Sequence, residues 1–366
     1  MGVLKRKSHA RNDLLQALFD RAQQAQIEAE IIDPCEPDPL PSPWLTADRE
    51  VITKSLTTTP IDALMEHLQD LAWYTRPVNK VAKRKEERLN GAEFWASLPE
   101  GLNPATAKAD LKKPGRAARK RAQMFSLVLL CLRCIRDGDI VVDFGAGSGH
   151  LGLCIAYLRP TCTVILVEPC EYHAQEQAKG RIAELGLINC SLYAAGVEEF
   201  AAANVDFDVG ISLHSCGTIT DKALSLCLAR RAAFCLCPCC YGEVARTGLL
   251  PRSKAWAASF DQSDFLTLAS AADTVAVRKP ADWDTFASSD SFARAKRCMR
   301  IVDADRLQYA AEMGNYRTLI TSLQPLNCSP KNNVIIGTPT AGSVRRGDIP
   351  LPVDKNTPQH LRGSQA

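Results

Sequence analysis

Short apolar runs alternate with longer amphipathic runs from residue 124 onwards. Residues 140–142 and 164–167 contain only Ile, Val and Leu, which is typical of strands buried on both faces. The apolar spacing predicts strands at 140–144, 163–168, 191–194, 209–213 and 233–237, and helices at 124–135, 151–158, 173–185 and 221–230. Alternation of this kind predicts an α/β fold, a mainly parallel sheet with helices on both faces.

The two ends of the chain follow different patterns. Residues 318–323 and 333–337 predict two further strands joined by a polar loop, an antiparallel hairpin that would complete a seven-stranded sheet. Upstream, residues 12–32 and 61–74 have helical periodicity, and five prolines lie between them at 34–43. We therefore divide the chain into a helical, linker-rich extension at 1–115, an α/β domain at 116–340 and a disordered tail at 341–366.

The positive charge of the chain is concentrated in one segment. The net charge of +3 is too small to indicate a nucleic-acid-binding protein. The segment from Lys80 to Arg121, however, holds twelve Lys and Arg against five Asp and Glu. Such a stretch could neutralise the phosphates of RNA, or it could be a solvated basic linker.

The apolar runs and the cysteines of the chain indicate its cellular compartment. No run of about 18 apolar residues occurs, and residues 1–13 lack the apolar stretch of a secretory signal, so we expect no membrane span and no secretion. Several of the 15 cysteines, such as Cys131, Cys154 and Cys235, lie in apolar runs where a thiol packs as a small hydrophobic group. These features favour a reducing, cytoplasmic location and leave the oligomeric state open.

A glycine-rich turn connects the first predicted strand to the next helix. Asp143 is followed by Gly145, Gly147 and Gly149, and glycines let the backbone turn sharply and approach a ligand closely. Glu168 follows the next strand, where a carboxylate can accept both ribose hydroxyls of an adenosyl cofactor. The acidic Asp143 favours S-adenosylmethionine, because the aminopropyl end of that cofactor is cationic and carries no pyrophosphate.

The same turn also fits a second motif. Gly147, Gly149 and Gly152 satisfy G-x-G-x-x-G, the fingerprint of dinucleotide-binding folds. In that frame Glu168 comes too soon after the last glycine, at 16 residues rather than about 20. We therefore favour the methyl donor over a nicotinamide cofactor, while a purely structural role for the glycines remains a third interpretation.

Candidate acceptor residues follow the fourth predicted strand. Ligands of open α/β sheets bind outside the carboxyl ends of the strands, which is where His214 and Cys216 lie. Methyl transfer requires an acceptor held in line with the sulfonium, and in some cases a base. His214 is the candidate for the base or for a positioning residue, and Asp221 could orient it or cap the following helix.

A cluster of cysteines follows the start of the fifth predicted strand. Cys235, Cys237, Cys239 and Cys240 lie within six residues, but they do not form the two C-x-x-C pairs of the usual closed zinc site. We therefore expect packing of small side chains rather than a metal site, with zinc as the alternative. Tyr241 follows the cluster, and its ring could stack beside the cofactor or shape the acceptor pocket.

With these motifs the domain resembles the methyltransferase domain of the glutathione S-transferase C-terminal domain-containing proteins. The resemblance is carried by residues 118–123, 143–152, 213–217 with Asp221, 237–242 and 327–334. It implies a Rossmann-like class I methyltransferase core that uses S-adenosylmethionine. More distantly, His214 to Gly217 with Asp221 is similar to tRNA 2′-O-methyltransferases, which implies an RNA acceptor contacted by His214, Cys216, Gly217 and Asp221.

Two features of the chain differ from that family. Residues 1–115 are too short and too rich in proline for the transferase-like domain, so we expect at most a remnant of it and no glutathione chemistry. Gly196 stands where the family tends to place an Asn that contacts adenine, so this contact is weakened or made by the backbone. Two functions remain: a methyltransferase acting on RNA, and an inactive module of the same fold that binds RNA or a protein.

Overall fold

The computed structural model describes residues 91–104, 115–170, 174–244, 251–258, 260–273, 289–313 and 316–339. The predicted helices at 12–32 and 61–74, parts of the basic segment from Lys80 to Arg121 and the tail at 341–366 lie outside these residues.

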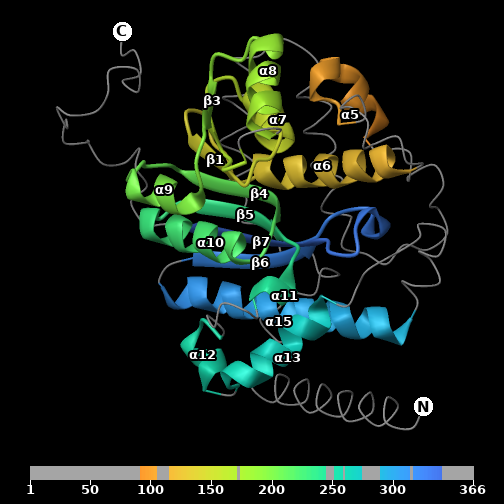
Figure 1. The fold of residues 1–366 in the computed structure, drawn as a ribbon, viewed down its shortest axis with the longest axis vertical. Helices are drawn as coiled ribbons and strands as arrows, with labels where there is room; N and C mark the ends of the chain where they lie inside the picture. The colour runs from red at the N-terminus through yellow and green to blue at the C-terminus, as the bar shows by residue number, and fades with distance from the viewer. Residues whose placement is uncertain are drawn as a thin grey trace.

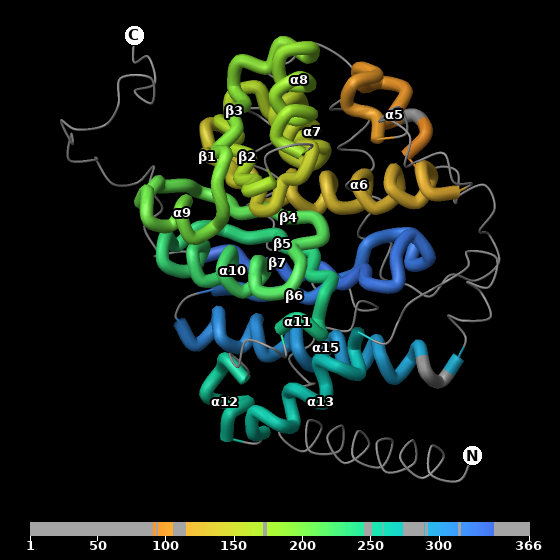
Figure 2. The backbone as a smooth tube through the Cα atoms, viewed as in Figure 1, coloured from red at the N-terminus to blue at the C-terminus, as the bar shows by residue number. Residues whose placement is uncertain are grey.

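The described residues form a seven-stranded sheet in the order β3-β2-β1-β4-β5-β7-β6. The strands are β1 Ile140–Phe144, β2 Thr163–Val167, β3 Cys190–Tyr193, β4 Val209–Ser215, β5 Ala233–Pro238, β6 Tyr316–Ser322 and β7 Asn333–Pro339. The first five strands pair in parallel, whereas β7 is antiparallel to both β5 and β6. The predicted fold class, a mainly parallel sheet with a terminal antiparallel hairpin, is confirmed, and Figure 2 shows this hairpin beside β5.

The sheet is covered on both faces, which explains its continuously apolar strands. Val141 packs into one apolar cluster and its neighbour Val142 into another. The first cluster includes α6 (Arg116–Leu132) and α7 (His150–Leu158), and the second includes α10 (Thr218–Arg230). In Figure 1, α6 and α7 lie on one side of the sheet, and α10 lies on the other. The helices α8 (Glu176–Leu185) and α9 (Val197–Ala202) complete the connections between the parallel strands.

Four helices that the structure describes between β5 and β6 were not predicted. They are α11 Tyr241–Val244, α12 Lys254–Ala257, α13 Gln262–Ala272 and α15 Asp290–Glu312. The long helix α15 packs against the β6–β7 hairpin and also against α13, so it lies between the sheet and an outer apolar cluster around Trp256 (Figure 1). Charged residues that α15 buries, among them Asp303 and Arg306, interrupt its apolar pattern, and this is why the sequence did not indicate it.

The helix α6 begins at Arg116, earlier than the predicted start at residue 124. Its basic first half and its apolar second half therefore form one continuous element. The short helices α5 (Ala92–Ser97) and η2 (Glu100–Leu102) precede it, and Phe94 of α5 packs against Phe125 with ring centroids 5.0 Å apart. Among the helices that the structure describes, none is long and apolar enough to cross a bilayer.

Candidate active site

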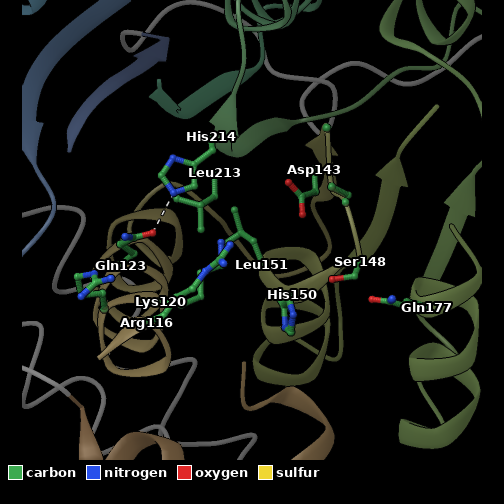
Figure 3. A pocket seen from close by; sticks show the side chains of 14 residues that line it. Arg116, Lys120, Gln123, Asp143, Ser148, His150, Leu151, Gln177, Leu213 and His214 are labelled. Carbon is green, nitrogen blue, oxygen red and sulfur yellow. Dashed lines mark hydrogen bonds between the residues drawn. The ribbon is translucent and has the colours of Figure 1, made fainter. Parts of the chain in front are cut away.

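A pocket of about 650 Å³ lies at the carboxyl ends of β1 and β4 (Figure 3). Its lining consists of Arg116, Arg119, Lys120, Gln123, Asp143, Gly145, Ala146, Gly147, Ser148, His150, Leu151, Gln177, Leu213 and His214. The topology produces this position because the order of the sheet reverses between β1 and β4, and crevices in open α/β sheets form at such a point. The pocket brings together four of the predicted site residues, Asp143, Gly145, Gly147 and His214.

The glycine turn forms one wall of the pocket. Gly147 and Gly149 have positive φ angles of 56° and 81°, which side chains with a Cβ rarely adopt. Glu168 lies beside the turn: its Oε2 accepts the N–H of Gly147 at 2.7 Å, and its Oε1 accepts the N–H of Cys170 at 2.9 Å. An ionised carboxylate has about four acceptor positions, so two remain after these bonds. Glu168 therefore shapes the turn and retains the capacity to accept hydroxyl groups.

Asp143 supplies a buried carboxylate to the pocket. Its Oδ2 accepts the N–H of Gly152 at 2.9 Å, and the side chain is 1% exposed. Burial raises the pKa of Asp143 to about 7, against the opposing effects of the Gly152 hydrogen bond and of Lys120. Near neutral pH this group is therefore poised to accept a cationic ligand in exchange for a proton.

His214 occupies a bulge at the end of β4. The pairing of β4 with β5 shifts between Leu213 and Ser215, and His214 has a φ of 64°, an uncommon angle for a residue other than glycine. The bulge interrupts the regular alternation of side chains, and the ring of His214 lines the pocket toward Gln123 (Figure 3). A strained residue beside a ligand pocket is typical of a functional position.

The protonation of His214 follows from its hydrogen bonds. Gln123 donates from Nε2 to the carbonyl oxygen of Cys328 at 2.6 Å, so its Oε1 accepts from Nε2 of His214 at 2.9 Å. The ring therefore carries its proton on Nε2 and leaves Nδ1 as an acceptor. Burial, with the charges of Lys120 and Lys331, lowers the pKa of His214 to about 4, so the ring is neutral at physiological pH.

The first half of α6 supplies cations that the sequence analysis did not assign to the pocket. Arg116, Arg119 and Lys120 line it beside Gln123. Burial lowers the pKa of Lys120, while the nearby Asp143 opposes this shift. The sequence signal was the segment 118–123, but its role was hidden because the predicted helix began after it. The pocket thus has an acidic part at Asp143 and a basic part on α6.

Asp221 and Tyr241 lie outside this pocket, contrary to the sequence-based expectation. Asp221 is the fourth residue of α10 and is 2% exposed, and both of its oxygens accept hydrogen bonds from Arg306 at 2.9 and 3.0 Å. Arg252 adds a third bond at 3.0 Å. Asp221 therefore neither orients His214 nor caps the helix, whose N-cap is Gly217.

Tyr241 belongs to the same buried network. Its hydroxyl donates to Oδ2 of Asp303 at 2.7 Å, and Oδ1 of Asp303 accepts from Arg306 at 2.9 Å. The tyrosine is 1% exposed, and burial raises the pKa of its hydroxyl well above the usual value. Because its hydroxyl is bonded to Asp303 and its side chain is buried, the ring does not line the pocket.

The other predicted residues do not line the pocket. Gly149 is the N-cap of α7, Gly196 is the N-cap of α9, and Glu168 lies beside the glycine turn. Cys216 follows β4 and is exposed, with its sulfur 3.2 Å from that of Cys239.

Comparisons with known proteins agree with this geometry. Residues 119–247 match a family model described as a methyltransferase domain. The chain is 34% identical over 298 residues to the glutathione S-transferase C-terminal domain-containing protein of Xenopus laevis, covering 78% of this chain and 46% of that protein. The Mus musculus protein of the same name is 37% identical over 247 residues, covering 67% and 36% respectively. The chain therefore spans less than half the length of these relatives.

Among solved structures, an rRNA methylase from Streptococcus thermophilus matches with a TM-score of 0.33 and 14% sequence identity, covering 63% of this chain and 99% of that chain.

Proposed function

Because the chain carries a class I methyltransferase domain and is related to the glutathione S-transferase C-terminal domain-containing proteins, we propose that it transfers a methyl group from S-adenosylmethionine to RNA. The observation that carries this proposal is the single pocket that joins Asp143 and the glycine turn to His214 and the cations of α6. A cationic methyl donor fits the first part, and an anionic acceptor fits the second.

The residues around the turn fit S-adenosylmethionine, which would supply an activated methyl group on its sulfonium. Glu168 would accept the ribose hydroxyls with the acceptor positions that Gly147 and Cys170 leave free. Asp143 would attract the cationic amino acid end, and Lys120 of α6 would attract its carboxylate. A pyrophosphate would instead meet the buried carboxylate of Asp143, which favours the methyl donor over a dinucleotide.

On the acceptor side, His214 would position the RNA group that receives the methyl. Its neutral ring presents Nδ1, which can accept the hydrogen of a hydroxyl or an amine. Arg116 and Arg119 line the pocket from α6, the helix that also carries Gln123, the partner of His214. They would contact phosphates, a group that Arg recognises well.

Parallel calorimetric titrations of the chain with S-adenosylmethionine, S-adenosylhomocysteine and NAD test the donor. We expect the two adenosyl ligands to bind and NAD not to bind. Transfer of label from S-adenosylmethionine to total RNA then tests the reaction. Binding without transfer would favour the inactive module, and a preference for NAD would refute the methyl-donor assignment.

The pH dependence of donor binding offers a test of Asp143. We expect the affinity for S-adenosylmethionine to rise roughly tenfold from about pH 6 to about pH 8, because a carboxyl of pKa about 7 is mostly protonated at the lower pH and ionised at the higher one. His150 and His214, with pKa values lowered by burial to about 3 and about 4, stay neutral throughout. Calorimetry over this range measures the effect. Asp143→Asn should bind more weakly with a flat profile, and a flat wild-type profile would contradict the role of Asp143.

A charge reversal on α6 offers a test of the RNA side. We expect the double variant Arg116→Glu, Arg119→Glu to bind RNA more weakly at low salt and to reduce the slope of log K against log salt by about 1.5, since each lost phosphate contact removes about 0.7 to 0.9. The matched control is Lys179→Glu with Lys222→Glu, which changes the net charge equally at exposed sites on α8 and α10. Equal slopes in the two double variants would mean that α6 does not contact phosphates.

A further inference from the structure

Three cysteine thiols meet at the carboxyl ends of β4 and β5. Cys216 follows β4, while Cys239 and Cys240 follow β5, and the pairing of Ser215 with Pro238 brings the two turns together. The sulfur of Cys239 lies 3.2 Å from that of Cys216 and 3.5 Å from that of Cys240. All three sulfurs lie within 4.8 Å of one another. The cluster is therefore a product of the fold, because 23 residues separate Cys216 from Cys239.

The spacing of the sulfurs matches a metal site. Thiolates bound to Zn²⁺ at about 2.3 Å in a tetrahedron lie roughly 3.8 Å from one another. Two of the separations in the cluster, 3.2 and 3.5 Å, are slightly shorter than this value, and the third is at most 4.8 Å. Small side-chain rotations would therefore place all three sulfurs around one ion. The separations are all well beyond the ~2.05 Å of a disulfide bond.

The structure separates these thiols from the other cysteines of the segment. Cys235 and Cys237 are completely buried in the apolar cluster that also holds Cys131, as the packing interpretation of the sequence expected. Cys239 and Cys240 instead turn toward Cys216, which is exposed to solvent. The group of three therefore has an open side through which an ion can enter.

The number and type of ligands favour a soft ion with one open position. Thiolates select Zn²⁺ or Cu⁺ over Mg²⁺ and Ca²⁺. Within the part of the chain that the structure describes, no carboxylate or imidazole joins the three sulfurs. Asp273, an acidic residue close enough to act on Cys216, is paired with Lys331. Three protein ligands with an open fourth position are typical of zinc sites that exchange water or substrate.

We propose that Cys216, Cys239 and Cys240 form a Zn²⁺ site at the edge of the sheet that also carries the pocket. The ion would link the turn between β4 and α10 to the turn between β5 and α11. His214 lies two residues before Cys216, so this link would hold the bulge of β4 in place beside the pocket. The proposed Zn²⁺ site does not depend on S-adenosylmethionine or on RNA, so its test is independent of the test of the proposed reaction.

Metal binding by the full-length chain tests the site. The reduced protein is first stripped with a chelator and is then titrated with Zn²⁺ in competition with a chromophoric chelator. Titration with Co²⁺ detects sulfur ligands by the thiolate charge-transfer absorption. We expect about one ion per chain and a clear charge-transfer band. Cys216→Ser should weaken Zn²⁺ binding by about a hundredfold, at least as much as the loss of an outer-shell partner.

The matched control is Cys170→Ser, which removes another exposed thiol outside the cluster and should leave Zn²⁺ binding unchanged. Alkylation followed by mass spectrometry gives a second measurement on the wild-type chain. Zn²⁺ should slow the modification of Cys216 at least about tenfold and leave that of Cys170 unaffected, because a metal-bound thiolate is no longer free to react. Equal Zn²⁺ affinities of the wild type and Cys216→Ser, or equal alkylation of Cys216 with and without Zn²⁺, would overturn the proposal.

Discussion

Replacing Glu168 by alanine is expected to weaken the binding of S-adenosylmethionine by about a hundredfold. The carboxylate is 8% exposed and is held beside the glycine turn by the N–H groups of Gly147 and Cys170. Each hydrogen bond to a charged group contributes about 1.5 to 3 kcal/mol, so the loss of two ribose contacts removes roughly 3 kcal/mol, or about two powers of ten in affinity. Titration calorimetry of the wild type and the variant measures the difference directly.

Two further variants separate this effect from damage to the turn. Glu168→Gln keeps the shape of the side chain without its charge and should bind with intermediate affinity. Glu176→Ala removes an exposed acid on α8 that is paired with Lys179, and this variant should bind like the wild type. Circular dichroism should report the same fold for all three variants. If Glu168→Ala binds S-adenosylmethionine as the wild type does, the carboxylate has no part in donor binding.

The fold was predictable because its strands carry a local signal. A strand buried on both faces must be apolar at every position, so runs such as 140–142 and 164–167 identified the sheet without knowledge of its partners. The contact between Glu168 and Gly147 was predictable for a similar reason. The glycine turn and the next strand end are joined by a single helix, and the parallel pairing of β1 with β2 fixes their relative position.

The surroundings of Asp221 were not predictable in this way. In the sequence Asp221 is close to His214, and this proximity suggested a joint role. In the structure its partner is Arg306, which lies 85 residues away on a helix that the apolar pattern did not indicate. The same holds for Cys216, whose sulfur meets Cys239 only because β4 and β5 are neighbours. Pairs of polar side chains that are distant in sequence have no periodicity, so only the fold reveals them.

Replacing Arg306 by methionine is expected to destabilise the domain by about 3 to 5 kcal/mol. Arg306 is 1% exposed and bonds two buried carboxylates, those of Asp221 and Asp303. Its removal leaves both carboxylates buried without that cation, and breaking a buried pair in this way costs about that much. For a domain of this size the loss lowers the melting temperature by roughly 10 °C. Thermal and denaturant unfolding measure it, with Arg300→Met on the same helix as the control, for which we expect a small effect.

The loss of stability in Arg306→Met is expected to depend on pH, because Arg306 sets the pKa of the carboxylates that it bonds. In the wild type, burial raises the pKa of Asp221, but Arg306 and Arg252 outweigh burial and lower it, so its contribution to stability is lost as the pH falls. In the wild type, burial already raises the pKa of Asp303 against the opposing charge of Arg306. In Arg306→Met, burial should raise the pKa of Asp221 and raise that of Asp303 further, so both take up protons on acidification. The deficit should therefore be largest near pH 7 and shrink toward about pH 5.

Donor binding in the same variant distinguishes a structural network from a catalytic one. Measured where Arg306→Met is still folded, the affinity for S-adenosylmethionine should stay within about twofold of the wild type, because neither Asp221 nor Tyr241 lines the pocket. A variant that melts like the wild type would contradict the stabilising role of Arg306. If a folded variant no longer binds S-adenosylmethionine, Asp221 and Tyr241 contribute to the active site after all. The network would then couple the position of α15 to the pocket.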